Sequence, residues 1–154
     1  MDKNKVYVFD FSLAKLETLV FEQRKGYRFW HFATSPHPDE GFKEVQNKRG
    51  YSLDVLGGRE YAVNTVTTNP IKGKKYTNKY GSSYTVVSAN AVVKTKYKTF
   101  KNCMVVRVKN PKDFYYDYTY YYYAPHHGQI KVAEKKNNKL TTVIELVEVR
   151  NKKK

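Results

Sequence analysis

The side chains most able to do chemistry in this sequence are the lone cysteine, Cys103, and the adjacent histidines His126 and His127. A thiol and an imidazole far apart in sequence can form a nucleophile and its general base once the chain folds. Cys103 opens the apolar run 103–106, however, and a free cysteine in such a run usually packs as a small hydrophobe. We therefore predict that the protein is not an enzyme. A hydrolase that uses Cys103 with a histidine is the less favoured interpretation.

The histidine pair is also the feature closest to a metal site. Adjacent residues of an extended chain point to opposite sides, so both imidazoles reach one metal only in a special turn. A single cysteine rules out an internal disulfide and a multi-cysteine metal site. The glycine-rich patterns that bind nucleotide phosphates are missing as well. We expect no catalytic residues, no metal and no cofactor.

A run of aromatic residues at 114–123 offers a surface for binding rather than for catalysis. In an extended chain the even-numbered residues of this run share one wholly aromatic face, which predicts a buried core face. The odd-numbered face is mixed and is the better candidate for ligand contact, because tyrosines among lysines resemble, in composition, platforms on which nucleic-acid bases stack. The predicted ligand-binding residues are Tyr115, Tyr121, Tyr123, Trp30, His126 and His127.

The charge of the chain indicates the kind of partner. Its 154 residues carry 29 Lys and Arg against 14 Asp and Glu, a formal net charge of +15. Such a surplus favours a polyanion, namely nucleic acid, an anionic membrane surface or an anionic cell-wall polymer. A lysine-rich surface without a specific partner is equally compatible with the charge alone. The oligomeric state cannot be read from the sequence.

The beginning of the sequence bears on its location. Residues 1–5 are polar, and the apolar run after them is too short and too alternating for a signal peptide or a membrane span. We expect no transmembrane segment. We then expect a cytoplasmic protein, unless a leader was removed from a longer precursor, in which case we expect it to be extracellular or on the cell surface.

Alternating β-branched and aromatic residues, separated by turn signals, predict strands along most of the chain. The expected fold is all-β: a single curved antiparallel sheet or half-barrel of about 8–11 strands, because a longer sheet must curl, split or close. At most one short helix is expected, beginning at Ser12 as its N-cap. Residues 1–150 are predicted to form a single domain and 151–154 a basic tail. Residues 121–131 are predicted to form a hairpin corner, because Pro125 ends a strand and Gly128 permits a turn.

The second half of the sequence, from Pro70 onward, resembles a known group of proteins. The features that carry this likeness are residues 70–76, the segment Thr99-Phe100-Lys101-Asn102-Cys103, the segment 121–131 and the closing strand at Glu145. They resemble the C-terminal β domain of uncharacterised bacterial cell-surface lipoproteins. The resemblance implies a curved antiparallel sheet akin to the LolA and LolB lipoprotein carriers, and it supplies no catalytic residue.

Together these features predict a non-catalytic binding domain of the bacterial cell envelope. Its partner would be an apolar or anionic surface component, such as an anionic polymer or a lipid-like ligand. The alternative, which the lysines and tyrosines also fit, is a cytoplasmic nucleic-acid-binding protein of phage or mobile-element type.

Overall fold

The described residues form a single antiparallel sheet of 12 strands. The computed structural model describes residues 1–11, 14–33, 35–47, 50–56, 65–67, 70–77, 81–111 and 115–153. The strands are β1 (Lys5–Phe11), β2 (Ala14–Arg24), β3 (Tyr27–Phe32), β4 (Gly41–Asn47), β5 (Gly50–Leu56), β6 (Thr65–Thr67), β7 (Lys75–Thr77), β8 (Ser83–Lys94), β9 (Thr99–Lys109), β10 (Tyr118–Ala124), β11 (Gly128–Lys136) and β12 (Lys139–Asn151).

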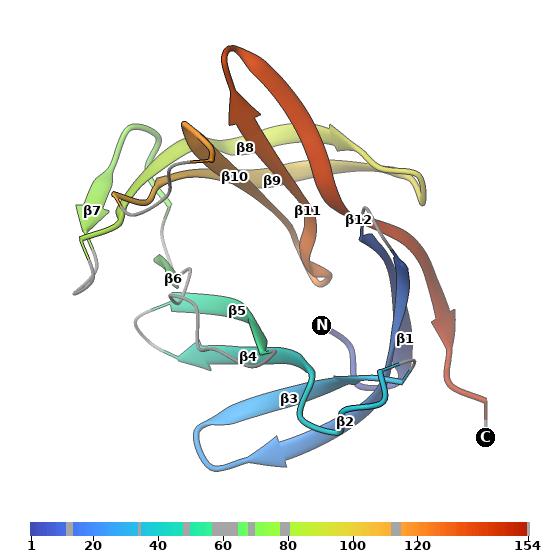
Figure 1. The fold of residues 1–154 in the computed structure, drawn as a ribbon. Coiled ribbons are helices and arrows are strands. Elements are labelled where there is room, and N and C mark those ends of the chain that lie inside the picture. Colours follow the sequence, from blue (N-terminus) through green and yellow to red (C-terminus); the bar gives the residue numbers. More distant parts are fainter. Residues whose placement is uncertain are drawn as a thin grey trace.

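The strand order places the two ends of the chain side by side at the middle of the sheet. It runs β6-β5-β4-β3-β2-β1-β12-β11-β10-β9-β8-β7, so the first and last strands of the chain pair at the centre of the sheet. Figure 1 shows the sheet curling until its two halves face each other, with the N-terminus inside the curve. The predicted all-β, curved antiparallel sheet is confirmed. The strand count exceeds the expected range because the edge strands β6 and β7 have only three residues each.

The helix expected near Ser12 is wrong. Ala14 and the residues after it belong to β2, which pairs with β1 from Phe11↔Ala14 to Tyr7↔Thr18. Hydrogen bonding between neighbouring strands outweighs the weak helix preference of this short segment. Ser12 itself lies outside the described residues.

The hairpin corner predicted at residues 121–131 is confirmed. Ala124 of β10 pairs with Gly128 of β11, and the turn between them is closed by a hydrogen bond from His127 N to Ala124 O at 3.2 Å. Gly128 has a φ of +71°, a conformation that glycine adopts at little cost. The corner brings the aromatic strand β10 against β11.

Among the described residues, two hydrophobic clusters stabilise the sheet. The larger draws on both halves of the molecule and comprises Tyr7, Phe9, Trp30, Phe32, Phe42, Val93, Phe100, Cys103, Ala124, Ile130 and Leu146. The smaller comprises Tyr84, Val106, Val108 and Tyr123. Because successive side chains of a strand point to opposite faces, Ala124 in the larger cluster and Tyr123 in the smaller one show that β10 is buried on both faces.

Candidate functional site

The aromatic strand is mainly a structural element. Tyr122 packs against the larger cluster, whereas Tyr121 packs against the smaller one and Tyr123 belongs to it with an exposed fraction of 5%. The odd-numbered face was predicted to be mixed and to be the better candidate for ligand contact, but at Tyr123 this face is buried. The reason is the neighbouring strand, in which Met104 and Val106 lie opposite Tyr123 and Tyr121 and provide an apolar surface. Phe114, which was expected on the core face, lies outside the described residues.

Tyr115 lies on the molecular surface, before β10 begins. Its side chain is 74% exposed, and that of Tyr116 is 39% exposed. Nearby in the sequence, the Asp117 carboxylate accepts a hydrogen bond from Asn137 N at 2.9 Å and so ties this segment to the turn between β11 and β12. Among the three tyrosines predicted to contact a ligand, Tyr115 is thus the accessible one.

The two histidines of the corner have different surroundings. His126 is exposed, with a φ of +62°. The half-buried ring of His127 lies edge-on to Phe100, with 5.0 Å between ring centroids, and its Nδ1 is 2.9 Å from Pro125 O. Burial is the main cause that lowers the pKa of His127 from its usual value of 6.5, and the positive charges of Lys98 and the N-terminus lower it further. The hydrogen bond to Pro125 acts in the opposite direction and raises the pKa. His127 is therefore biased toward its neutral form.

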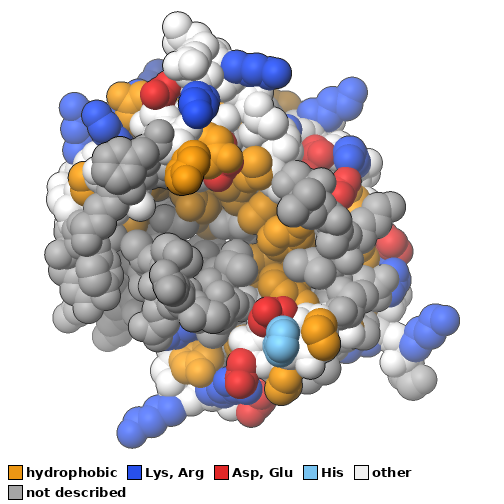
Figure 2. Space-filling view, in the orientation of Figure 1, with side chains coloured by type: hydrophobic (Ala, Val, Ile, Leu, Met, Phe, Trp, Pro, Cys, Tyr) orange, Lys and Arg blue, Asp and Glu red, His pale blue; other side chains and the backbone are white. Residues whose placement is uncertain are grey.

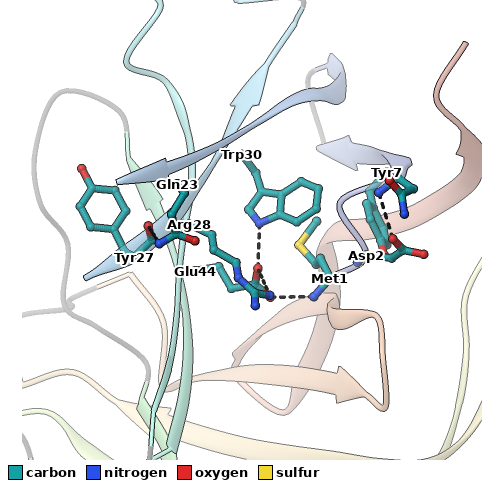
Figure 3. Close-up of polar contacts among 9 residues, drawn as sticks. Met1, Asp2, Tyr7, Gln23, Tyr27, Arg28, Trp30 and Glu44 are labelled. Carbon is teal, nitrogen blue, oxygen red and sulfur yellow. Dashed lines mark hydrogen bonds and ion pairs between the residues drawn. The ribbon is translucent and has the colours of Figure 1, made fainter. Parts of the chain in front are cut away.

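A buried polar cluster lies around Glu44, whose side chain is 1% exposed. Its Oε1 accepts a hydrogen bond from the Met1 ammonium at 2.6 Å, and its Oε2 accepts one from Trp30 Nε1 at 2.8 Å. The partly exposed Arg28 places Nη1 3.9 Å from Oε2. Figure 3 shows the ammonium and the indole N–H both directed at this carboxylate. A carboxylate removed from water requires such partners, since an unpaired buried charge is very costly.

Strands β3 and β4 position this cluster. Trp30 lies opposite Phe42, and Arg28 lies opposite Glu44. Alternation along β4 puts Phe42 and Glu44 on one face, directed into the core. Gly41 permits the close approach of the two strands, because a Cβ atom there would lie 2.1 Å from the Trp30 carbonyl oxygen.

The segment that precedes β1 completes the cluster. The Met1 side chain packs against the larger hydrophobic cluster, and Asp2 N donates a hydrogen bond to the Tyr7 hydroxyl at 2.7 Å. The Tyr7 ring lies edge-on to Trp30, with 5.7 Å between centroids. Burial is the main cause that raises the pKa of Tyr7, and the negative charges of Asp2 and Glu44 raise it further. The hydrogen bond from Asp2 N lowers the pKa. The hydroxyl therefore stays protonated at neutral pH.

The structure does not bring the six predicted ligand-binding residues together. Trp30 is fully buried beside Glu44, Tyr121 and Tyr123 pack at the smaller cluster, and His127 packs on Phe100. Sequence reasoning missed Glu44. The available signal was its alternation with Phe42, which places an acidic residue on the same face as a core aromatic residue. Whether the six residues contact a ligand stays a prediction.

Cys103 lies in the larger hydrophobic cluster with an exposed fraction of 0%. Burial raises the pKa of its thiol, although a backbone hydrogen bond opposes the effect. A nucleophilic cysteine needs the opposite, a lowered pKa and access to substrate. Within the described part of the chain, no three His, Cys, Asp or Glu side chains are grouped as metal ligands. The absence of enzymatic activity stays a prediction.

The surface of the protein is basic. Every lysine whose side chain is described is exposed or half-buried, and Figure 2 shows Lys and Arg side chains around the periphery of one face. Several acidic side chains are already engaged in ion pairs, namely Asp10, Glu22, Glu44, Glu145 and Glu148. The surplus of positive charge therefore faces solvent. No helix of the described residues is long and apolar enough to cross a membrane.

One turn combines this charge with an exposed apolar side chain. Residues 70–75 comprise the turn before β7 and the first residue of β7, and in this segment Ile71 is 64% exposed and Lys72, Lys74 and Lys75 are exposed. The turn is held against β8 by hydrogen bonds from Gly73 N to Val86 O at 2.8 Å and from Val86 N to Lys74 O at 3.0 Å. These residues are named the Ile71 turn below. The Ile71 turn therefore presents an exposed apolar side chain in the same short segment as three exposed lysines.

Comparison with known proteins gives little further information. No family model matches the chain, and no curated protein matches it. A crystal structure of a proposed lipoprotein from Parabacteroides distasonis aligns with this chain at 13% sequence identity and a TM-score of 0.34. The alignment covers 97% of this chain and 96% of the lipoprotein chain. At that TM-score the alignment is no basis for assigning a fold or a function.

Proposed function

We propose that this chain is a non-catalytic binding domain of the bacterial cell envelope, and that the Ile71 turn attaches it to an anionic surface, of which an anionic lipid membrane is the best candidate. The observation that carries the proposal is the exposed Ile71 beside three exposed lysines on a turn fixed to β8. An apolar side chain can enter the interface of a bilayer while neighbouring cations bind the anionic headgroups. The resemblance of the sequence from Pro70 onward to cell-surface lipoproteins supports the location.

The lysines of the Ile71 turn set the expected strength. Each lysine close to an anionic membrane contributes about 1 kcal/mol at physiological ionic strength. Three of them contribute about 3 kcal/mol, which corresponds to an affinity higher by about two orders of magnitude. Screening by salt weakens this contribution, because exposed charges are separated from the surface by solvent.

Substitution of the three lysines tests the proposal. The variant Lys72→Gln, Lys74→Gln, Lys75→Gln should bind vesicles that contain phosphatidylglycerol about 100-fold more weakly than the unaltered protein. A matched control, Lys25→Gln, Lys136→Gln, Lys153→Gln, removes the same charge from exposed positions elsewhere and should lose less than about tenfold. Equal losses in the two variants would show that net charge acts without a defined contact surface.

A nucleic-acid partner is the second candidate, supported by the surface before β10. Tyr115 and Tyr116 are exposed there, Arg107 lies 4.6 Å from the centroid of the Tyr118 ring, and Lys109 is exposed. Exposed aromatic rings beside cations suit the stacking of single-stranded bases. If this candidate is right, a single-stranded oligonucleotide binds with an affinity that falls steeply with salt, and Tyr115→Ala weakens that binding. Binding to oligonucleotide without binding to anionic vesicles would favour this candidate over the first.

A further inference from the structure

Within the described part of the chain, the outer edge of β8 is unpaired over most of its length. β8 has 12 residues, and β7 pairs with Ser83–Thr85 only. The next residue, Val86, is bonded to Gly73 and Lys74 of the Ile71 turn. Over residues 87–94, named the β8 edge below, β9 is the one described strand that pairs with β8. Figure 1 shows β7 beside one end of β8 only. Such an edge presents backbone N–H and C=O groups that can pair with another strand.

The β8 edge is accessible and has a composition that suits strand pairing. Ala89, Asn90 and Val92 are exposed, and the exposed fraction of Val92 is 67%. Residues 87–93 include three valines, which favour extended backbone. They include neither proline nor a charged residue, two features with which edge strands commonly resist pairing. The β8 edge is therefore a surface to which a further strand can be added.

Two features keep the β8 edge from pairing indiscriminately. The register between β8 and β9 shifts at three points from Val86 to Val93. Bulges of this kind increase the local twist, so a flat strand fits poorly. In addition, Asn90 N donates to Ser88 Oγ at 3.3 Å, a long hydrogen bond that an incoming strand has to replace. A partner strand therefore needs a further source of affinity.

Charge supplies that source. Residues 61–112 contain 11 Lys and Arg and no Asp or Glu. Exposed lysines lie at both ends of the β8 edge, with Lys94 at one end and Lys74 and Lys75 of the Ile71 turn at the other. Opposite charges on neighbouring strands stabilise their pairing, and like charges weaken it. An acidic strand is thus favoured over a second copy of this chain, which would bring the same positive charge.

We infer that the β8 edge binds an extended acidic peptide segment of another protein, which adds a strand to the sheet beside β8. Backbone hydrogen bonds to the edge supply the basic affinity of such strand addition. Acidic side chains near the ends of the segment face the lysines that flank the β8 edge, and an uncharged centre faces residues 87–93. The inference does not depend on the attachment of the Ile71 turn to a membrane.

The test uses the full chain and a labelled peptide, the acetylated amide Glu-Glu-Thr-Val-Thr-Val-Thr-Glu-Glu. This peptide is acidic at both ends, and its uncharged centre favours extended backbone. A control peptide with proline in place of the central threonine keeps the charge but lacks one backbone donor. Fluorescence anisotropy should show that the proline peptide binds about tenfold more weakly. Hydrogen exchange of the amides of the β8 edge should slow when the first peptide is bound.

A pair of variants locates the contact. Val92→Glu places a negative charge on the β8 edge at an exposed position, and it should weaken binding of the acidic peptide about fivefold. Leu140→Glu is the matched control, because Leu140 is 51% exposed on β12 and gains the same charge. This control should weaken binding less than about twofold, since a charge far from the contact is screened by salt.

The outcomes separate strand addition from its alternatives. Equal binding of the two peptides, or equal losses in the two variants, would mean that charge alone attracts the peptide and would overturn the inference. Unchanged hydrogen exchange at the β8 edge would also overturn it, and this measurement on the unaltered chain decides the matter even if Val92→Glu fails to fold. Dimerisation that Val92→Glu abolishes, without peptide binding, would overturn it in favour of a second copy. Vesicle binding is a separate outcome, because both variants leave Ile71 and its neighbouring lysines in place.

Discussion

Replacing Glu44 by glutamine should destabilise the fold far more than replacing an acidic residue on the surface. Glutamine keeps the volume of the side chain and one acceptor oxygen, but it places an amide NH2 group against either the Met1 ammonium or the Trp30 N–H. One buried donor then faces another donor, and the ammonium loses its counter-charge. Breaking a buried ion pair by removing one partner costs about 3–5 kcal/mol. For a chain of this size that corresponds to a fall in melting temperature of about 6–20 °C.

The assay is urea unfolding followed both by Trp30 fluorescence and by far-UV circular dichroism. The two probes should give coincident transitions, a lower midpoint and an unchanged slope, as expected when stability alone has changed. Glu148→Gln is the matched control. Glu148 pairs with Arg150 on the surface, where the two side chains are 49% and 40% exposed. Its loss should cost less than about 1 kcal/mol. Equal costs in the two variants would refute the reasoning that Glu44 is stabilised by buried partners.

Three further predictions concern backbone packing and pH. Gly41→Ala should destabilise the fold by several kcal/mol, because its Cβ would lie 2.1 Å from the Trp30 carbonyl oxygen, a backbone atom that cannot move alone. Thermal unfolding measures the loss of stability. A loss below about 0.5 kcal/mol, which is typical of surface substitutions, would contradict the prediction. Burial, the main cause, lowers the pKa of His127 from 6.5, so the unfolded chain binds more protons and stability falls as pH drops below the unfolded value. His127→Asn should make denaturant midpoints less dependent on pH between about 5 and 7, a range set by the usual titration of histidine; an unchanged dependence would argue against it. Burial, the main cause, raises the pKa of Tyr76 from 10.0 to about 12, so the folded chain holds its proton longer and stability is lost as pH rises between those values. Tyr76→Phe should remove this part of the alkaline loss, and an identical alkaline midpoint would show that the prediction is wrong.

The sequence predicted those parts of the fold that depend on local signals. Pro125 and Gly128 are enough to define the hairpin corner, because proline cannot continue a ladder and glycine accepts the positive φ of the turn. The segment after Ser12 was predicted as helix because only its local preferences were visible. Its actual conformation comes from pairing with β1, a non-local contact that helix propensity does not include.

The candidate sites depended on contacts between distant parts of the chain. Tyr123 lies on the face of β10 that the alternation of side chains predicts. Its burial, however, depends on Met104 of β9 and on the smaller hydrophobic cluster. Glu44 gains its buried partners only when β3 brings Trp30 beside it and Met1 lies inside the curve of the sheet. No sequence motif predicts that these three distant residues come into contact. The net charge, in contrast, follows from composition alone, and the described lysines lie on the surface.

The most direct test of the proposed function is cosedimentation of the unaltered protein with vesicles of two compositions. One set contains phosphatidylcholine alone, and the other contains phosphatidylglycerol as well. Binding to each set is measured at about 50 mM and at about 500 mM salt, because the Debye length falls to about a third between these concentrations. We predict binding to the anionic vesicles at low salt, a strong decrease at high salt and little binding to the neutral vesicles. Failure to bind the anionic vesicles at low salt, or equal binding to both compositions, would contradict the account.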